Sequence, residues 1–373
     1  MSRPRRVGIN ALFLDPGVSG GSETYVRALL PELVRSFPAV RFELATTRRG
    51  AAALAAEDWA GEVGLLRLPC DDDEPLQRTL AEQVSLPRLA RARGWDVVHS
   101  LANRGPRVAG TASVLTVLDV IFFHHRTMGP VSTHGMRWAV RVAVAGADEL
   151  ISISDAAAGD VAAVLGVPRD RITAIPLGPG RSAERSETTE AARERHGLGR
   201  GRIVLCVAAK RSHKNQQLLI EALGCLPGDV VLALVGHDEG YGRELSETAA
   251  RAGVSDRVRL LEGVPDGELE ALWEAAACAA FPTIAEGFGL PVLEAMRRGV
   301  PVACSDIPVL REVAGGAARF FDPADADAAA AAIAACLRDP EAGARGRDRA
   351  SGFTWERCAA ETFAVYERAA GAR

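Results

Sequence analysis

The sequence predicts an α/β protein with two doubly wound domains, each built on a parallel sheet with helices on both faces. The chain has 373 residues, and a single hydrophobic core rarely grows beyond about 250–300 residues. Short apolar runs rich in β-branched residues alternate with amphipathic segments along nearly the whole chain, which is typical of parallel sheets. A polar, glycine-rich segment at 178–202 separates two series of such runs, so we place a linker there.

Each series contains enough predicted strands for one doubly wound domain. The first series comprises residues 7–14, 42–46, 63–68, 97–100, 114–118, 149–153 and 172–175. The second comprises residues 203–208, 230–235, 258–261, 279–281, 302–304 and 318–321. The predicted helices include residues 23–36, 216–226, 267–277 and 290–298, an alanine-rich surface helix at 325–337 and an amphipathic terminal helix at 354–369.

These elements divide the chain into four parts. We expect an N-terminal domain at 1–180, a linker at 181–200, a C-terminal domain at 201–353 and a terminal helix at 354–373. Ligands bind at the carboxyl ends of the strands in such sheets, and two facing domains form a central cleft. A polar linker between separate cores also predicts a hinge that closes around a bound ligand.

The composition is that of a globular protein and excludes several functional classes. Apolar residues make up 48% and charged residues 25% of the chain, while the net charge is −4 and aromatic residues are only 5%. Neither a basic surface nor a base-stacking surface is indicated, so we expect no nucleic-acid partner. The seven cysteines form no C-x-x-C pair and mostly lie in apolar runs, as expected for buried, reduced thiols.

We expect neither a signal peptide nor a transmembrane segment. The basic N-terminus is followed by only a short apolar stretch, and no window approaches 18 uncharged apolar residues. The expectation is a cytoplasmic enzyme, with peripheral membrane contact left open.

The strongest chemical motif is FPTIAEGFGLPVLEAM, at 281–296. A predicted strand runs into a loop that contains Gly287 and Gly289, and a helix follows with a proline in its first turn. Such a helix start exposes backbone N–H groups at the positive end of its dipole, which suits a diphosphate. Glu286 and Glu294 bracket this site, and their carboxylates can accept hydrogen bonds from sugar and ribose hydroxyls. The alternative without a binding role is an ordinary capped helix with two solvated glutamates.

A second motif, VAAKRSHKNQQLLIEAL at 207–223, places four basic side chains after a buried strand. They are Lys210, Arg211, His213 and Lys214. Cations at the carboxyl end of a strand suit a phosphate, although a solvated basic loop is an equal alternative.

A third motif, LDPGVSGGSETYVRALL at 14–30, carries Gly20 and Gly21 ahead of a helix. It lacks the G-x-G-x-x-G spacing, so it is a poor match to a nicotinamide-binding fingerprint. The glycines permit either a purely structural tight turn or a close approach of substrate to the backbone.

Together these segments resemble the family 4 retaining glycosyltransferases, which have the GT-B fold of two facing Rossmann-like domains. The resemblance covers almost the whole chain. In order, the matching segments are GGSETYVRALLPEL, ISISDAAAGDVAAVLGVPRDRITAIPLG, HKNQQLLIEAL, LVGHDEGYGREL, VRLLEGVPDGELEALWEAA and AEGFGLPVLEAMRRGVPVACSDIPVLREVAGGAARFFDP.

The resemblance implies that the C-terminal domain binds a nucleoside-diphosphate sugar. Lys214 would contact the diphosphate, Glu286 with the N–H groups of Phe288 and Gly289 would hold the sugar, and Glu294 would hold the ribose. The remaining positions implied to lie near the donor are Gly287, Lys210, His213, Val264 beside the base, and Gly20 and Gly21 on the phosphate and acceptor side. The terminal helix would cross back onto the N-terminal domain.

Two positions depart from the family pattern. Ala209 stands where members often carry an arginine, and Lys210, Arg211 or His213 could replace its charge. Leu118 stands where many members have a histidine near the reacting carbon. Asp119 directly after it remains, and we take it as the candidate for an acceptor contact. His124 and His125 follow, away from the motif position, and are read as ordinary loop histidines.

The implied reaction is transfer with retention from a nucleotide sugar to an acceptor hydroxyl, in cell-surface glycan or natural-product biosynthesis. Lys214 and the helix start would stabilise charge on the leaving phosphate, and that phosphate can itself accept the proton of the acceptor. We expect no cofactor and no metal, since the D-x-D at 71–73 lies in a charged, proline-flanked loop. Acceptors in such families are small molecules, glycans or lipid-linked sugars. The alternatives are a nucleotide-sugar epimerase, a phosphorylase-like enzyme, and a non-catalytic nucleotide-sugar-binding protein.

Overall fold

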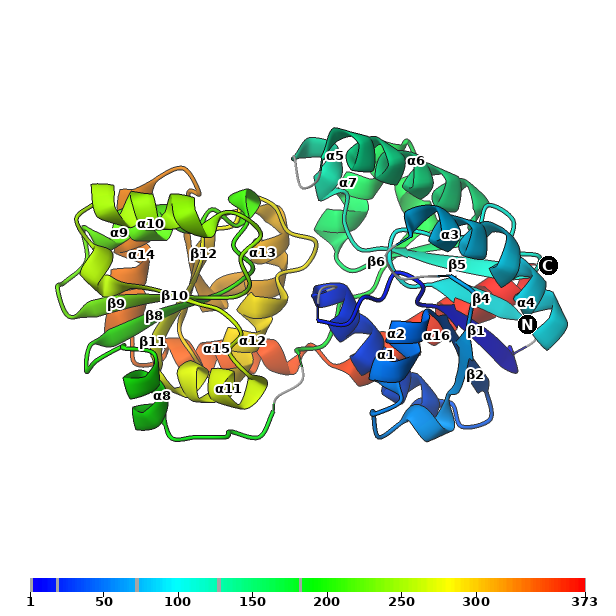
Figure 1. The fold of residues 1–373 in the computed structure, drawn as a ribbon, viewed down its shortest axis with the longest axis horizontal. Coiled ribbons are helices and arrows are strands. Elements are labelled where there is room, and N and C mark those ends of the chain that lie inside the picture. The colour runs from blue at the N-terminus through cyan, green and yellow to red at the C-terminus, as the bar shows by residue number, and fades with distance from the viewer. Residues whose placement is uncertain (1–2, 18–19, 71–73, 126–128, 181–182, 373) are drawn as a thin grey trace. The chain divides into compact units, whose positions relative to one another are not determined.

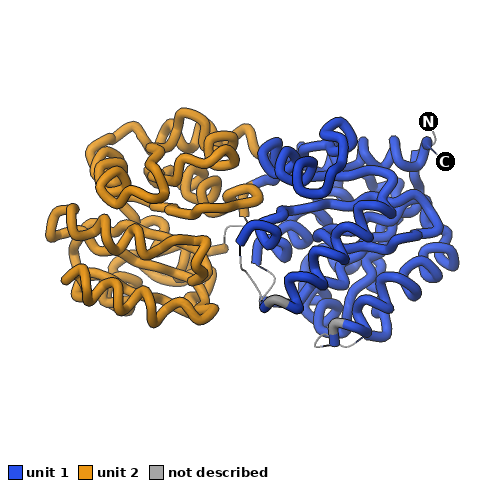
Figure 2. The backbone as a smooth tube through the Cα atoms, turned by 90° about the horizontal axis from the view of Figure 1, so that it is seen from above, with its two compact units in different colours: residues 1–178, 354–373 blue, residues 179–353 orange. Residues whose placement is uncertain are grey.

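The computed structural model describes residues 3–17, 20–70, 74–125, 129–180 and 183–372. They form two compact units, drawn in different colours in Figure 2. Unit 1 comprises residues Met1–Gly178 and Thr354–Arg373, and unit 2 comprises Pro179–Phe353. The chain therefore enters unit 2 after Gly178 and returns to unit 1 for its last helix.

The described part of unit 1 contains a seven-stranded parallel sheet in the order β3-β2-β1-β4-β5-β6-β7. Its central strands are buried on both faces, which is why their sequences RVGIN, VVHS and ASVLTV are short and mostly apolar. The strands are β1 Arg6–Asn10, β2 Arg41–Thr46, β3 Gly64–Arg67, β4 Val97–Ser100, β5 Ala112–Val117, β6 Glu149–Ser152 and β7 Ile172–Ala174.

Helices cover both faces of this sheet (Figure 1), with α1, α2 and α16 on one side and α3 to α7 on the other. The α-helices are α1 Gly21–Ser36, α2 Arg48–Leu54, α3 Pro75–Leu80, α4 Leu86–Arg93, α5 Ile121–His124, α6 Pro130–Gly146, α7 Asp155–Leu165 and α16 Trp355–Gly371. The short helical turns are η1 Ala60–Glu62, the π-helical η2 Ala81–Ser85, and η3 Arg169–Arg171.

Unit 2 contains a six-stranded parallel sheet among its described residues, in the order β10-β9-β8-β11-β12-β13. The first strand of the unit, β8, lies in the middle of the sheet, so the strand order reverses there, where doubly wound sheets bind ligands. The strands are β8 Arg202–Val207, β9 Val230–Val235, β10 Val258–Leu261, β11 Ala276–Phe281, β12 Val302–Ser305 and β13 Ala318–Phe321.

Helices again cover both faces of the sheet. Figure 1 shows α9, α10 and α14 on one side, with α11, α12 and α15 on the other. The helices are α8 Thr189–Arg195, α9 Gln216–Leu223, α10 Gly242–Arg251, α11 Asp266–Ala275, α12 Leu290–Arg298, α13 Pro308–Ala314, α14 Ala326–Arg338 and α15 Ala342–Ser351, with the 3-10 turns η4 Ser212–Lys214, η5 Ser255–Arg257 and η6 Gly315–Ala317.

Each predicted strand and helix is confirmed, and the differences concern the ends of elements and one helix that was not predicted. Strand β1 stops at Asn10 rather than at residue 14, because the Asn10 side chain accepts a hydrogen bond from the N–H of Leu12 (3.2 Å) and turns the chain. Within the predicted linker at 181–200, the structure instead has helix α8, capped by Thr188 and part of unit 2. The compositional signal there was correct for a polar surface, but it missed a short amphipathic helix that buries Ala192.

The terminal helix α16 packs within unit 1, as expected for a helix that crosses back. Phe363 stacks on Phe37 of the segment after α1, with ring centroids 3.8 Å apart. Tyr366 also bonds the buried His99 of β4, with 2.7 Å between its hydroxyl and Nδ1. Burial lowers the pKa of His99 to about 3, so this imidazole stays neutral and serves packing. No helix in the described part of the chain is long and apolar enough to cross a membrane.

Candidate active site

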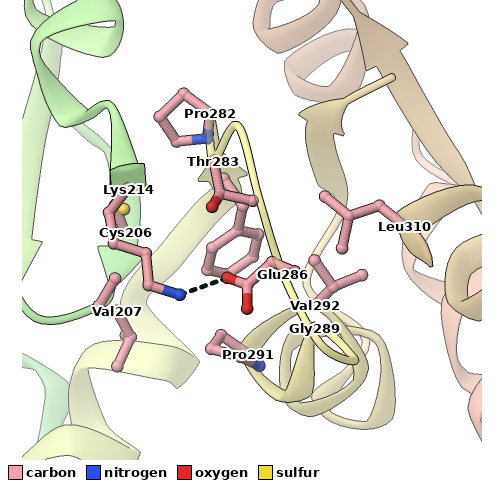
Figure 3. A pocket seen from close by; sticks show the side chains of 12 residues that line it. Cys206, Val207, Lys214, Pro282, Thr283, Glu286, Gly289, Pro291, Val292 and Leu310 are labelled. Carbon is pink, nitrogen blue, oxygen red and sulfur yellow. Dashed lines mark hydrogen bonds and ion pairs between the residues drawn. The ribbon is translucent and has the colours of Figure 1, made fainter. Parts of the chain in front are cut away.

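A small pocket in unit 2 gathers the two strongest sequence motifs (Figure 3). It lies at the carboxyl ends of β8 and β11 and at the start of α12. The space it encloses is about 10 Å³, which is room for about one water molecule. Its lining residues are Cys206, Val207, Ala208, Lys214, Phe281, Pro282, Thr283, Glu286, Gly289, Pro291, Val292 and Leu310.

Lys214 and Glu286 form an ion pair across this pocket, drawn as the dashed line in Figure 3. Their side chains are only 19% and 16% exposed. Lys214 comes from turn η4 and Glu286 from the loop after β11, and the two residues are 72 positions apart in the sequence. The structure therefore brings together a cation and an anion that the sequence placed in separate motifs.

Two polar side chains hold the Lys214 and Glu286 loops against each other. Asn215 has a left-handed backbone (φ 55°) and donates hydrogen bonds to the carbonyls of Pro282 (3.1 Å) and Pro323 (2.8 Å). The Thr283 hydroxyl donates to the carbonyl of His213 (3.1 Å), and the N–H of Ile284 donates to the same oxygen (2.9 Å). Sequence reasoning missed Asn215 and Thr283. The asparagine directly before a helix was the available signal, since asparagine tolerates positive φ.

The start of α12 has the geometry of an anion site. Gly289 is its N-cap with φ 95°, a conformation that strains any other residue, and an added Cβ would lie 2.6 Å from Cδ2 of Leu310. The helix then begins with Leu290 and Pro291, and the N–H groups of Val292 and Leu293 donate to the Gly289 carbonyl (3.0 and 3.2 Å). Because Pro291 has no N–H, this helix start offers an anion the positive end of its dipole and the N–H groups ahead of Pro291. Phe288 is buried against Phe353, with ring centroids 6.0 Å apart, so it anchors the loop.

Glu294 lies one turn further along α12 and does not line the pocket with Glu286. Its carboxylate lies directly against Gly180, where a Cβ would come within 1.9 Å of Oε1. Desolvation raises the pKa of Glu294 to about 7, although Arg298 opposes the shift. Glu270 and Asp266 raise it further, and Arg297 lowers it. A partly buried carboxylate with a raised pKa is a feature of binding and catalytic sites.

Lys210 and Arg211 do not face this pocket. Lys210 is fully buried, and its ammonium donates to the carbonyls of Gly236 and Leu261 (3.2 Å for Leu261) at the ends of β9 and β10. Burial lowers the pKa of Lys210, and Glu262 at 3.8 Å opposes that shift. Arg211 pairs instead with Glu239.

The Lys210 ammonium is thus bonded to carbonyls at the sheet edge, and its contact with the donor stays a prediction. His213 is buried and contributes its backbone carbonyl to the loop contacts above. None of Lys210, Arg211 and His213 lines the pocket that contains Lys214. Val264 is partly buried in the loop after β10, beside Gly263 with φ 61°, and is also outside this pocket.

The remaining candidates belong to unit 1. Gly20 (φ 52°) and the exposed Gly21 begin α1. Glu23 holds this loop by accepting from the N–H of Gly17 (2.8 Å) and pairing with Arg27 (2.7 Å).

Asp119 follows β5 at the carboxyl edge of the unit 1 sheet. Its Oδ1 accepts from the N–H of Ile121 at 3.1 Å. The Asn103 side chain holds the backbone at Leu118 and Asp119 in place. It donates to the Asp119 carbonyl (3.2 Å) and accepts from the N–H of Leu118 (2.7 Å), and Asn103 itself has φ 56°. Asn103 had no motif signal in the sequence. His124 ends α5, with His125 just after it, and residues 71–73 lie outside the described residues.

Comparison with known proteins identifies the family of this chain. A family model described as "Glycosyltransferase Family 4" matches residues 19–178, and one described as "Glycosyl transferases group 1" matches residues 188–351. A D-inositol 3-phosphate glycosyltransferase of Thermobispora bispora is 30% identical over 304 residues, which is 74% of this chain and 71% of that protein. The chain belongs to the family 4 glycosyltransferases.

This glycosyltransferase is also similar to an MMP alpha-(1->4)-mannosyltransferase of Mycolicibacterium hassiacum. The two are 35% identical over 231 residues, covering 59% of this chain, and the chain spans about half, 54%, of that relative. Among solved structures, HepE of Anabaena in complex with UDP and glucose superposes with a TM-score of 0.73 at 19% identity. The superposition covers 96% of this chain and 98% of the HepE chain, so this chain has the predicted GT-B fold.

Proposed function

We propose that this glycosyltransferase moves a sugar, with retention and without a catalytic metal, from a nucleoside-diphosphate sugar to an acceptor hydroxyl. The observation that carries the proposal is the Lys214–Glu286 ion pair at the N-terminus of α12. A cation, an anion and a helix start thus meet at the carboxyl edge of a doubly wound sheet. The relatives support the donor class, since HepE is described with UDP and with UDP-glucose.

The pocket must open for a diphosphate to enter. Its enclosed space is about 10 Å³, and the ion pair occupies the position between the loop and α12. We therefore expect the donor to separate the ion pair. The diphosphate then pairs with the Lys214 ammonium, and the sugar hydroxyls donate hydrogen bonds to the Glu286 carboxylate. Each charged group exchanges one partner for another, so neither is left desolvated and unpaired.

The same two groups then favour the transition state. The bond from the anomeric carbon to the phosphate oxygen breaks, leaving negative charge on the phosphate and oxocarbenium character on the sugar. Lys214 and the positive end of the α12 dipole stabilise the phosphate, and Glu286 stabilises the positive sugar. The acceptor oxygen attacks from the face that the phosphate leaves, and its proton passes to that phosphate. No step needs a protein nucleophile.

Glu294 and Asp119 have secondary roles in this proposal. Glu294 accepts hydrogen bonds from the ribose hydroxyls, and Asp119 of unit 1 contacts the acceptor. A divalent ion is not required at the diphosphate because Lys214 and the α12 N-terminus already supply positive charge there. The acceptor classes remain small molecules, glycans and lipid-linked sugars.

An assay of nucleoside diphosphate release tests the proposal. GDP-mannose and UDP-glucose are the first donors, because the relatives' names include mannosyltransferases and a UDP-glucose complex. Release that depends on an acceptor, with a glycoside product of unchanged anomeric configuration by NMR, supports retaining transfer. Interconversion of the donor without an acceptor indicates an epimerase, and tight donor binding without turnover indicates a binding protein. Inverted product or manganese-dependent activity would contradict retention and metal independence, respectively.

A further inference from the structure

A second cluster of ligating side chains lies in unit 2, in residues that take no part in the proposed transfer. Glu187 stands just before α8, His196 just after it, and Glu268 in the first turn of α11. One ligand atom from each lies within 4.8 Å of the others. Helix α8 follows the crossover from unit 1, so this cluster joins the first helix of unit 2 to α11.

Two side-chain atoms of these residues are buried and have no hydrogen-bond partner. They are Oε1 of Glu187 and Nε2 of His196. The Glu187 side chain is only 10% exposed, and those of His196 and Glu268 are 13% and 17% exposed. A buried carboxylate oxygen without a donor carries a desolvation cost, so a missing partner is expected at this point.

The spacing of the cluster matches a zinc coordination shell. Nε2 of His196 lies 3.4 Å from Oε2 of Glu268. Two ligands at about 2.0–2.2 Å from a tetrahedral Zn²⁺ are separated by about 3.4 Å. All three ligand atoms lie within 4.8 Å of one another, so Glu187 completes the set when its separations from the other two shorten by at most about 1.4 Å. We propose that Glu187, His196 and Glu268 bind one Zn²⁺ ion, which fastens α8 to α11.

The donor chemistry favours zinc over the hard cations. One imidazole nitrogen with two carboxylate oxygens suits Zn²⁺, whereas Mg²⁺ and Ca²⁺ prefer sites made only of oxygen. None of the three residues lines the pocket with Lys214 and Glu286, so the ion has no part in transfer.

Arg195 is the competitor at this site. Its guanidinium donates to Oε2 of Glu187 at 2.9 Å and lies 3.8 Å from Oε2 of Glu268. A purely ionic cluster, in which Arg195 and His196 neutralise two glutamates, is therefore the alternative. The Arg195 side chain is 58% exposed, so it can turn into solvent when a metal takes its place.

The test is a titration of the metal-stripped full chain with Zn²⁺ by calorimetry, with the melting temperature measured in parallel. We expect one Zn²⁺ per chain at the tightest site, a rise in melting temperature, and no response to Mg²⁺. Glu268→Gln and His196→Gln should each weaken binding at least tenfold. His237→Gln is the matched control, since His237 pairs with Glu239 at 2.7 Å outside the cluster. Cys225→Ser is a second control, because Cys225 is the exposed cysteine and its thiol could bind Zn²⁺ outside the cluster. This variant should bind Zn²⁺ like wild type.

Arg195→Gln separates the two alternatives. A metal site gains affinity when the competing guanidinium is removed, so Zn²⁺ should bind several times more tightly. An ionic cluster only loses stability and gains no affinity, and that result overturns the proposal. It is also overturned if wild type binds no Zn²⁺, or if His196→Gln binds like wild type. Circular dichroism without metal confirms that each variant folds, and Glu187→Gln replaces any variant that does not.

Discussion

Replacing Glu286 by glutamine should strengthen the binding of free nucleoside diphosphate while lowering turnover. In the unliganded pocket the Lys214 ammonium is paired with Glu286, and a diphosphate must displace that carboxylate. The amide of Glu286→Gln is neutral and releases Lys214 more readily. In transfer, however, the same variant loses the negative charge beside the oxocarbenium-like sugar.

The size of the effect follows from the exposure of the pair. The two side chains are 19% and 16% exposed, so the pair is neither a surface ion pair nor a fully buried one. Exposed pairs contribute about 0.2–1 kcal/mol, and hydrogen bonds to charged groups about 1.5–3 kcal/mol. An intermediate value of about 1–2 kcal/mol corresponds to a dissociation constant about 5–30-fold lower in the variant.

Calorimetric titration of UDP and GDP, beside steady-state kinetics of the same preparations, measures both effects. Glu239→Gln is the matched control, because Glu239 pairs with Arg211 outside the pocket and is 29% exposed. It should change neither quantity appreciably. If Glu286→Gln binds nucleoside diphosphate no more tightly than wild type, the ion pair is not the barrier to entry. Full turnover in this variant would refute the role of Glu286 at the sugar.

Further predictions concern the proposed donor site, and the last one concerns the zinc cluster. Lys214→Ala should lower kcat by roughly 10²–10³-fold in steady-state kinetics, as for other groups that stabilise developing negative charge; a change in KM alone would contradict this role. Wild type should bind nucleoside diphosphate more tightly as the pH rises through about 7, because the Glu294 carboxylate accepts hydrogen bonds more strongly than the protonated acid. Glu294→Gln should lack this pH dependence, and at pH 8 it should bind about 1.5–3 kcal/mol more weakly than wild type, as titration calorimetry would show. Glu294 alone should contribute a loss of about 3 kcal/mol of unfolding free energy between pH 4.5 and pH 8, since the folded state holds its proton more tightly; chemical denaturation of Glu294→Gln should lack this contribution. Gly289→Ala should destabilise the fold by about 1–3 kcal/mol and weaken nucleotide binding, because φ is 95° and Leu310 is 2.6 Å from the new Cβ; an unchanged melting temperature would show that the loop relaxes freely. Chelators should lower the melting temperature through the zinc cluster yet leave transfer intact, and loss of both together would place the metal in the reaction.

The sequence was sufficient for the architecture because the signals involved are local. Strands buried on both faces must be short apolar runs, and the helices between them must carry an apolar stripe. These patterns predicted every strand of both sheets and the start of α12 at Leu290. The loop with Gly287 and Gly289 could likewise be predicted, because a strand that ends in glycines before a helix has few structural alternatives.

Other features depended on contacts between segments far apart in the chain. Lys210 and Lys214 are four residues apart in one basic loop, and their residue types and spacing did not separate them; only the family resemblance assigned the diphosphate to Lys214. In the structure the Lys210 ammonium donates to the Gly236 carbonyl after β9, while the loop after β11 places Glu286 against Lys214. Asn103 and Asn215 hold their loops through positive φ and bonds to distant carbonyls. Helix α8 was missed because its apolar face is little more than Ala192. The sequence determined which residues form strands, helices and glycine loops, since hydrophobic periodicity and backbone freedom act over a few neighbouring residues. Only the tertiary structure decided which charges meet, because a side chain's partner is set by which strand ends lie side by side in the sheet.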